Sequence, residues 1–156
     1  MHMTINHDFL DSLLIQAKAS ERLRQNYDLR TSPDDDSQRM LNALWSGTEV
    51  PIHCHPKSSE NVILLKGVVD EVIYEEVTVA EPGNKELLRG GFEPEVKTHT
   101  VLREKDRIRL DTKNGCLGYV VPAGVWHKVE AIEPSVIYDA KDKRYGEDGT
   151  TNFQTI

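Results

Sequence analysis

The stretch G-T-E-V-P-I-H-C-H-P-K-S-S-E-N-V-I-L-L-K-G, from Gly47 to Gly67, carries most of the information about the fold. His53 and His55 are separated by one residue, and the period of two in a β-strand sends both imidazoles to the same face. Glu60 follows after four residues that include Pro56 and two serines, which allows a turn that returns a carboxylate to the histidine pair. Three potential metal ligands therefore share one hairpin.

A fourth potential ligand comes from a later segment of the chain. His127 follows the turn residues P-A-G-V-W at 122–126 and opens a strand, so it can complete the site from a facing or neighbouring strand. A His-x-His pair alone is more often polar surface or hydrogen-bonded core. Three imidazoles and one carboxylate, however, suit one divalent ion of Zn, Fe, Mn, Ni or Co, with bonds of about 2.0–2.2 Å. We predict one such ion per chain, held by His53, His55, Glu60 and His127.

The segment 47–67 resembles the first motif of the cupin superfamily, G-x5-H-x-H-x4-E-x6-G, at every defined position. The second cupin motif, G-x5-P-x-G-x2-H-x3-N, is matched from Pro122 to His127, whereas its first and last positions differ, with Cys116 in place of the first glycine. The resemblance covers about 40–140. It implies an all-β fold, the cupin double-stranded β-helix barrel or jelly roll, with the metal inside.

More narrowly, the chain is similar to the WbuC-type cupin-fold metalloproteins. The similarity lies in S-E-R-L-R-Q-N-Y-D-L from Ser20, Q-R-M-L-N-A-L from Gln38 and E-P-S-V-I-Y-D-A-K from Glu133. Tyr27 stands where that family commonly has histidine. Its members are associated with bacterial surface-polysaccharide gene clusters, so the resemblance implies a role in surface-polysaccharide metabolism without defining a reaction.

The N-terminal segment has the pattern of an amphipathic helix at about 8–21. Phe9, Leu13, Leu14 and Ala17 fall on one helical face, and Asn6 can cap the N-terminus. We therefore expect one α-helix before the barrel.

The remainder of the chain has the pattern of a β-barrel at about 38–140. Eight strands are expected, at 40–45, 50–55, 61–66, 68–79, 107–110, 117–121, 127–131 and 135–140. The Gly-, Pro- and charge-rich segment between Glu81 and Thr98 predicts a long hairpin loop near the barrel mouth. The polar segment 141–156 is expected to be a surface arm or to be partly disordered. Together these parts predict a single cupin domain over 1–156.

Polar residues just before the metal hairpin could contact a ligand. In an extended segment Arg22, Arg24 and Asn26 share one face, and Arg39 follows in the next predicted strand. Guanidinium groups bind carboxylates and phosphates in a bidentate manner. We predict that Arg24, Asn26 and Arg39 help to bind an anionic or hydroxyl-rich small molecule; the alternative is surface ion pairing with Asp34–Asp36.

The composition limits the partners and the location of the protein. A formal net charge of −7 disfavours non-specific attraction to nucleic acid or to an anionic membrane. No apolar run approaches membrane-spanning length and the N-terminus does not resemble a secretory signal, so a cytoplasmic protein is expected. In that reducing compartment Cys54 and Cys116 should be buried free thiols that bind no metal. Small barrels leave strand edges open, which predicts a homodimer.

Two classes of function agree with these patterns. The leading hypothesis is a metal-dependent enzyme of the isomerase/epimerase or dioxygenase type that acts on a small polar molecule such as a sugar or sugar nucleotide. Four protein ligands leave one or two positions open on a five- or six-coordinate ion, as such chemistry requires. The alternative is a non-catalytic metal-containing barrel that binds or senses a ligand. The sequence identifies no catalytic residue.

Overall fold

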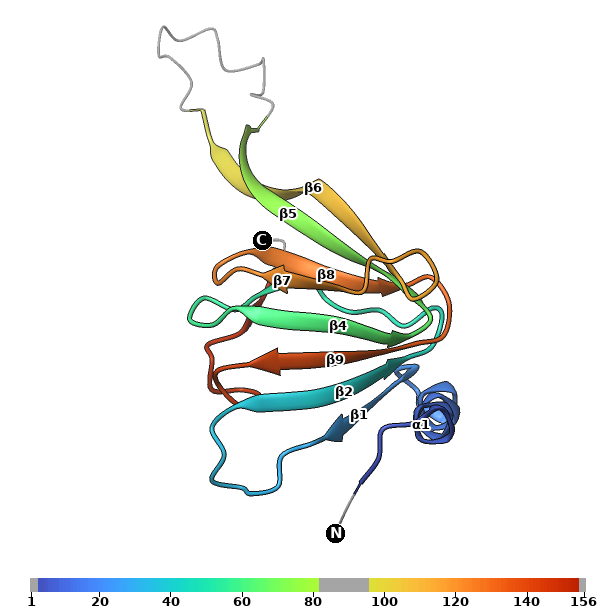
Figure 1. Ribbon diagram of the computed structural model, residues 1–156. Coiled ribbons are helices and arrows are strands. Elements are labelled where there is room, and N and C mark those ends of the chain that lie inside the picture. The colour runs from blue at the N-terminus through green and yellow to red at the C-terminus, as the bar shows by residue number, and fades with distance from the viewer. Residues whose placement is uncertain (1–2, 82–95, 155–156) are drawn as a thin grey trace, which may run out of the picture.

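The computed structural model describes residues 3–81 and 96–154, which form one helix followed by two five-stranded antiparallel sheets (Figure 1). The elements are α1 (His7–Ala19), β1 (Arg24–Asp28), β2 (Gln38–Leu44), β3 (His53–Cys54), β4 (Glu60–Lys66), β5 (Val68–Ala80), β6 (Thr98–Asp111), β7 (Gly118–Val121), β8 (Trp126–Ala131), β9 (Ser135–Lys141) and β10 (Thr151–Asn152). The strand orders are β1-β2-β9-β4-β7 and β10-β3-β8-β5-β6. The expected all-β jelly roll with one N-terminal helix is confirmed.

Helix α1 covers the outer face of the first sheet. Asn6 caps its N-terminus, because the side chain accepts a hydrogen bond of 2.9 Å from the Phe9 backbone N–H. The helix buries its apolar stripe against β2 and β9, and full burial of one leucine side chain contributes about 1.5–3 kcal/mol. The buried members of this cluster are Leu10, Leu13, Leu14, Ala17, Leu41, Ala43 and Val136.

The interior of the barrel changes from polar to apolar along β4. On β4 the inward-facing positions are Glu60, Val62 and Leu64, in line with the period of two. Val62 and Leu64 belong to an apolar cluster with Leu44, Val69, Leu110 and Ile137. Glu60 lies at the other end, among polar residues that line a cavity. The apolar cluster therefore packs one end of the barrel interior, and the polar cavity lies at the other end.

The described residues form ten strands rather than the eight expected, and β6 is longer than its expected range of 107–110. β6 begins at Thr98 rather than near 107, and the distal parts of β5 and β6 extend beyond the barrel as a paired ribbon (Figure 1). The residues of β6 before 107 are mostly exposed, so no apolar pattern marks them as strand, whereas the β5 half of the ribbon was expected. The hairpin loop expected between Glu81 and Thr98 falls mainly on 82–95, outside the described residues.

The C-terminal segment after Lys141 is mostly exposed, but it is attached to the barrel at two points. β10 pairs with β3, where Asn152 lies opposite His53. Asp148 has no exposed surface and accepts a hydrogen bond of 2.8 Å from the buried Lys141 side chain. A buried carboxylate such as Asp148 needs a hydrogen-bond partner, and Lys141 supplies it from the end of β9. Polar composition alone did not indicate these two points of attachment.

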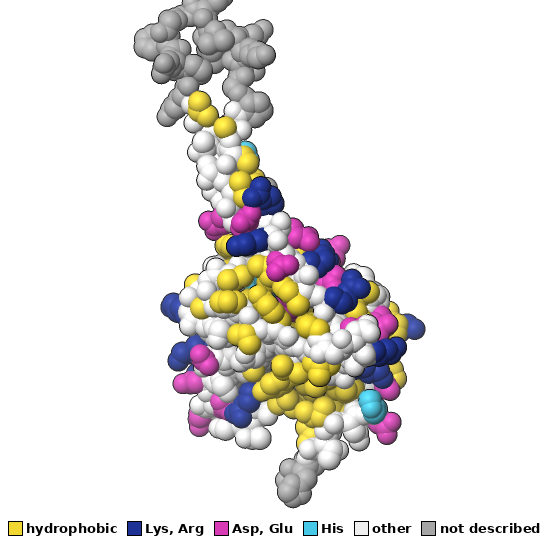
Figure 2. Space-filling view, turned by 45° about the horizontal axis from the view of Figure 1, so that its top comes forward, with side chains coloured by type: hydrophobic (Ala, Val, Ile, Leu, Met, Phe, Trp, Pro, Cys, Tyr) yellow, Lys and Arg dark blue, Asp and Glu magenta, His cyan; other side chains and the backbone are white. Residues whose placement is uncertain are grey.

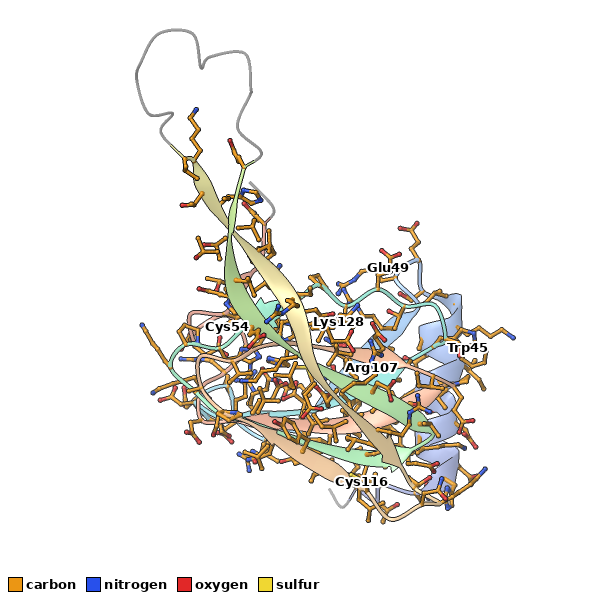
Figure 3. All side chains as sticks on the ribbon, turned by 90° about the horizontal axis from the view of Figure 1, so that it is seen from above. Trp45, Glu49, Cys54, Arg107, Cys116 and Lys128 are labelled. Carbon is orange, nitrogen blue, oxygen red and sulfur yellow. The ribbon has the colours of Figure 1, made fainter. Side chains whose placement is uncertain are left out.

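The two cysteines are free thiols in separate parts of the barrel (Figure 3). Cys54 is buried as expected, whereas Cys116 is exposed, because it lies in the turn between β6 and β7. The described residues contain no helix that is both long and apolar enough to cross a membrane.

Candidate metal centre

Three strands and the segment after β3 bring the four predicted ligands together. His53 on β3 lies opposite His127 on β8 in one sheet, while Glu60 begins β4 in the other sheet. His55 follows β3 directly. One potential ligand atom from each of these four residues lies within 4.8 Å of the other three, so one ion with bonds of about 2.0–2.2 Å could touch all four after small movements.

Backbone carbonyl groups orient two of the imidazoles. The Nδ1 atom of His53 lies 2.9 Å from the carbonyl oxygen of Pro51, and that of His127 lies 3.0 Å from the carbonyl oxygen of Val125. A carbonyl can only accept a hydrogen bond, so Nδ1 of both rings carries a proton. In His53 this leaves the Nε2 lone pair free, whereas Nε2 of His127 lies 2.8 Å from Glu60 Oε2. This arrangement is typical of metal-ligating histidines.

His55 is oriented by the C-terminal segment instead. Its Nδ1 atom lies 2.8 Å from Asp148 Oδ2 and 2.7 Å from Thr150 Oγ1, while Lys141 Nζ donates to the same Asp148 oxygen. Burial alone would raise the pKa of Asp148, but hydrogen bonds from Lys141 and Thr150 hold it well below its ordinary value. Thr150, whose hydroxyl donates to Asp148, can therefore accept the Nδ1 proton of His55 and leave Nε2 for a metal.

The geometry around Glu60 tests whether a metal fits this cluster. Glu60 Oε2 lies 2.8 Å from His127 Nε2 and 3.0 Å from His55 Nε2. The second contact has poor hydrogen-bond geometry, so the buried Nε2 of His55 lacks a hydrogen-bond partner among the described residues. An unpaired buried nitrogen is costly, whereas a metal ion would use its lone pair. The donor set therefore fits a divalent ion.

The protonation states in the cluster also suit a metal. Burial, followed by the nearby charge of His127, lowers the pKa of His53 to about 4, so this imidazole is neutral at neutral pH. Burial opposes ionisation of Glu60, but the hydrogen bond from His127 outweighs it and places the pKa of Glu60 well below its ordinary value. Neutral imidazole and ionised carboxylate are the forms that coordinate metals.

A cavity of about 300 Å³ adjoins the cluster and is lined by both sheets. Its walls include the predicted ligand-binding residues Arg24 and Asn26, which face inward from β1. Arg24 donates from Nη1 to the carbonyl oxygen of Glu49 at 3.1 Å, and its buried Nε has no partner among the described residues. Burial and the charge of Arg22 lower the pKa of Arg24. This guanidinium therefore retains hydrogen-bonding capacity for a ligand.

Arg39, the third predicted ligand-binding residue, does not line the cavity. It pairs with Asp35 on the outside of the barrel, and its side chain is 46% exposed. The reason is strand parity, because Gln38, Met40 and Asn42 on β2 face the cavity and Arg39 lies between inward positions. The alternative interpretation, ion pairing with the aspartate run, describes Arg39 correctly.

Sequence reasoning missed two buried carboxyl groups in the cavity wall, Asp139 on β9 and Glu71 on β5. Asp139 accepts hydrogen bonds from Gln38 at 2.8 Å and Asn42 at 3.3 Å. Burial raises the pKa of Asp139 well above its ordinary value, and the charge of Glu60 raises it further. The available signal was an acidic residue inside an apolar strand, as in S-V-I-Y-D-A-K for Asp139 and V-V-D-E-V-I for Glu71.

The fold and the site together define a cupin-type β-barrel with a histidine–glutamate cluster that could hold a metal. A family model described as a domain of unknown function, DUF6016, matches residues 5–81, just under half of the chain. A search of curated proteins finds no match.

Among solved structures, the chain is similar to the capsular polysaccharide assembling protein CapF from Staphylococcus aureus, with 13% identity and a TM-score of 0.50. The match covers 87% of this chain and 31% of CapF. An oxalate oxidase in complex with the substrate analogue glycolate matches at 15% identity and TM-score 0.48, over 86% of this chain and 57% of that one. A protein of unknown function from Streptococcus pyogenes, SPY1581, matches at 15% identity and TM-score 0.47, over 94% and 92%. The chain thus spans about a third of CapF and little more than half of the oxalate oxidase, and the likeness to CapF shows the cupin fold.

Proposed function

We propose that this protein is a metal-binding cupin that holds one divalent ion on His53, His55, Glu60 and His127 and binds a small polar molecule beside it. The observation that carries the proposal is the convergence of three imidazoles and a carboxylate within 4.8 Å, with the buried His55 Nε2 lacking a hydrogen-bond partner. When bound, the ion would supply a Lewis-acidic centre with one or two open positions. Zn, Fe, Mn, Ni and Co all suit these donors.

The mouth of the cavity favours an anionic or hydroxyl-rich ligand. Arg22 and Arg24 both line the cavity, and no ion pair involving either is found in the described part of the chain. The overall charge of the protein is −7, so these two guanidinium groups are a local exception with directional donors. Asn26 adds an amide to the same wall.

We further propose that the protein is an enzyme of the isomerase/epimerase or dioxygenase type, acting on a sugar or sugar nucleotide. The wall beside the metal cluster contains the carboxyl groups of Asp139 and Glu71, which could hold or move a proton near the open positions. A non-catalytic ligand-binding barrel has no need of such groups. A role in surface-polysaccharide metabolism is in keeping with the resemblance to WbuC-type proteins and with the name of CapF, which assembles capsular polysaccharide.

The metal assignment is tested by elemental analysis of purified protein. We expect about one metal per chain in the wild type and a large loss in His53→Ala and Glu60→Ala. Cys54→Ser is the matched control, because Cys54 lies between the two histidines but on the opposite side of the strand. Full occupancy in both ligand variants would contradict the assignment.

The ligand site is tested by calorimetry with citrate, sugar phosphates and nucleotide sugars on the metal-loaded protein. Arg24→Ala should weaken the binding of any ligand that the wild type binds, because it removes an inward-facing guanidinium. Arg39→Ala is a matched control from the adjacent strand and should bind as the wild type does. Equal affinity in all three proteins, with metal retained, would contradict the pocket assignment.

We also propose that the protein forms a homodimer. Light scattering should give twice the mass of the 17.7 kDa chain, and a monomer at micromolar concentration would contradict it.

A further inference from the structure

Glu71 occupies an unusual place on the cavity wall. It lies on β5, is 1% exposed and lines the cavity beside the metal cluster. Its cross-strand neighbours are Val129 on β8 and Ile108 on β6, both of which pack against the apolar core. A carboxyl group thus lies where the polar and apolar ends of the barrel meet.

The carboxyl group of Glu71 has a hydrogen-bonding atom that the protein does not use. Its buried Oε2 makes no hydrogen bond with any described residue. Nearby polar groups are engaged elsewhere: the amides of Gln38 and Asn42 donate to Asp139, and Lys141 donates to Asp148. A buried polar atom without a partner destabilises a fold, and native proteins retain few of them. A molecule in the cavity is the remaining source of a partner.

The strand register places Glu71 near the metal cluster. Ile73 lies opposite the metal-cluster residue His127, and Glu71 is two positions along β5, on the same face. Arg24, the metal cluster and Glu71 all line the same cavity, so one ligand could contact all three.

Burial favours the protonated form of this carboxyl group. It raises the pKa of Glu71 well above its ordinary value of 4.5, and the charge of Glu60 raises it further. A protonated carboxyl group has an O–H to donate, and a hydroxyl or carbonyl oxygen is the natural acceptor.

We infer that Glu71 is a ligand-contacting residue that donates a hydrogen bond to an oxygen of a hydroxylated anion, whose charged group faces Arg22 and Arg24. This inference rests on the proposed function, because it takes the cavity beside the metal as the ligand site. It narrows the ligand to molecules that combine an anionic group with at least one hydroxyl group, such as sugar acids or sugar phosphates. Glu71 then distinguishes such a ligand from an apolar acid of similar length.

The test uses two probes with the same carboxylate and a six-carbon chain, gluconate with hydroxyl groups and hexanoate without them. Calorimetry on metal-loaded protein compares the wild type with Glu71→Met, which keeps the length but removes the donor. Gluconate should bind the variant about tenfold more weakly, the effect of losing one hydrogen bond, while hexanoate affinity stays unchanged. Glu71→Gln keeps an N–H donor, so its affinity for gluconate should fall only about threefold.

Asp70→Asn is the matched control, because it alters the adjacent buried carboxylate on the opposite face of β5. The ratio of gluconate to hexanoate affinity should equal that of the wild type. If Glu71→Met does not fold, the ratio of gluconate to hexanoate affinity measured in Glu71→Gln provides the test.

The outcomes separate the inference from the proposed function. A wild-type protein without metal overturns the proposed function. Metal-loaded wild type that fails to bind gluconate overturns the ligand class inferred here. An unchanged affinity ratio in the Glu71 variants, or an equal loss of both probes, overturns the role of Glu71 and leaves the metal site standing.

Discussion

Asp70 and Glu71 are neighbours on β5, each 1% exposed, and they point to opposite faces of the sheet. On the outer face, Arg109 Nη2 donates to Asp70 Oδ2 at 3.0 Å and Arg107 Nη1 donates to the same atom at 3.1 Å. On the inner face, Glu71 Oε2 has no such partner among the described residues. Two adjacent buried carboxyl groups therefore have opposite surroundings.

The difference distinguishes buried polar groups that stabilise the fold from buried polar groups that are available to bind a metal or a ligand. Arg109, followed by Arg107, lowers the pKa of Asp70, and Arg107 also contacts Glu104 and Glu130 in a network on β6 and β8. Figure 2 shows side chains of both charge signs gathered at the base of the projecting β5–β6 ribbon, and Figure 3 places Arg107 and Lys128 there. Outside, each buried charge meets its opposite within the protein. Inside, Glu71 Oε2 and His55 Nε2 lack such counterparts among the described residues, as expected where a metal and a ligand complete the site.

The largest expected effect concerns the metal on the inner face. Metal in thousandfold excess over its Kd should stabilise the wild type by about 4 kcal/mol, because the ion binds only the folded state. Thermal unfolding after EDTA treatment and after metal addition measures this. His127→Ala should lose the response, since it removes one of the converging ligands. Asp70→Asn is the control and should keep the stabilisation by metal. If metal stabilised His127→Ala as much as the wild type, the inner face would not be the metal site.

A smaller effect is expected from the residue that orients His55. Asp148→Asn removes the carboxylate 2.8 Å from His55 Nδ1 and should weaken metal binding about 10–100-fold, as is usual for such outer contacts. A competition titration with a chelating dye measures the Kd. Glu147→Gln is the control, because Glu147 pairs with Arg144 on the surface. Equal affinities in the two variants would show that Asp148 has no part in the metal site.

On the outer face, Asp70→Asn should lower the free energy of unfolding by about 1–3 kcal/mol, because charge-assisted hydrogen bonds to two arginines are lost. The partially exposed arginines can turn to water, which keeps the cost below that of a fully buried pair. Urea unfolding at neutral pH measures the change. Glu104→Gln removes an exposed carboxylate from the same network and should have a smaller effect.

Glu71→Met is expected to act in the opposite direction and raise the free energy of unfolding by about 1 kcal/mol. The substitution removes an unpaired buried polar group and fills the space with a flexible apolar side chain. Urea unfolding of metal-free protein isolates this effect from metal binding. Destabilisation by more than about 1 kcal/mol would show that Glu71 has a structural partner.

The smallest effect is a difference in pH dependence. The pKa of folded Asp70 lies below its ordinary value of 3.8, so its contribution to stability is present above that value and is lost as the pH falls through the folded pKa. The pKa of folded Glu71 lies above 4.5, so folded protein binds the proton more tightly and stability is lost as the pH rises from 4.5 towards the folded pKa. In metal-free protein, Glu71→Gln should therefore show a smaller loss of stability than the wild type on this rise. Parallel profiles would show that Glu71 titrates as an exposed group does.

The sequence predicted the local parts of the site because they depend on short-range geometry. The spacing of His53, His55 and Glu60 requires only the period of two and one turn, and the structure places these side chains together with His127. Strand parity could also have separated Arg39 from Asn42, since positions three apart on one strand face opposite sides. Which of these two faces lines the cavity was decided by the tertiary structure, because helix α1 covers the face that carries Leu41 and Ala43.

The sequence by itself determined the β-rich fold, the N-terminal helix and the set of potential ligands, because periodicity and spacing are properties of short segments. Only the tertiary structure decided that Asp148 orients His55, that Asp139 and Glu71 join the cavity wall, and that Asp70 does not. These outcomes depend on which strands pair and on which face each residue occupies. Strand pairing joins residues far apart in the chain, such as Asn152 with His53, and no local pattern records such a contact.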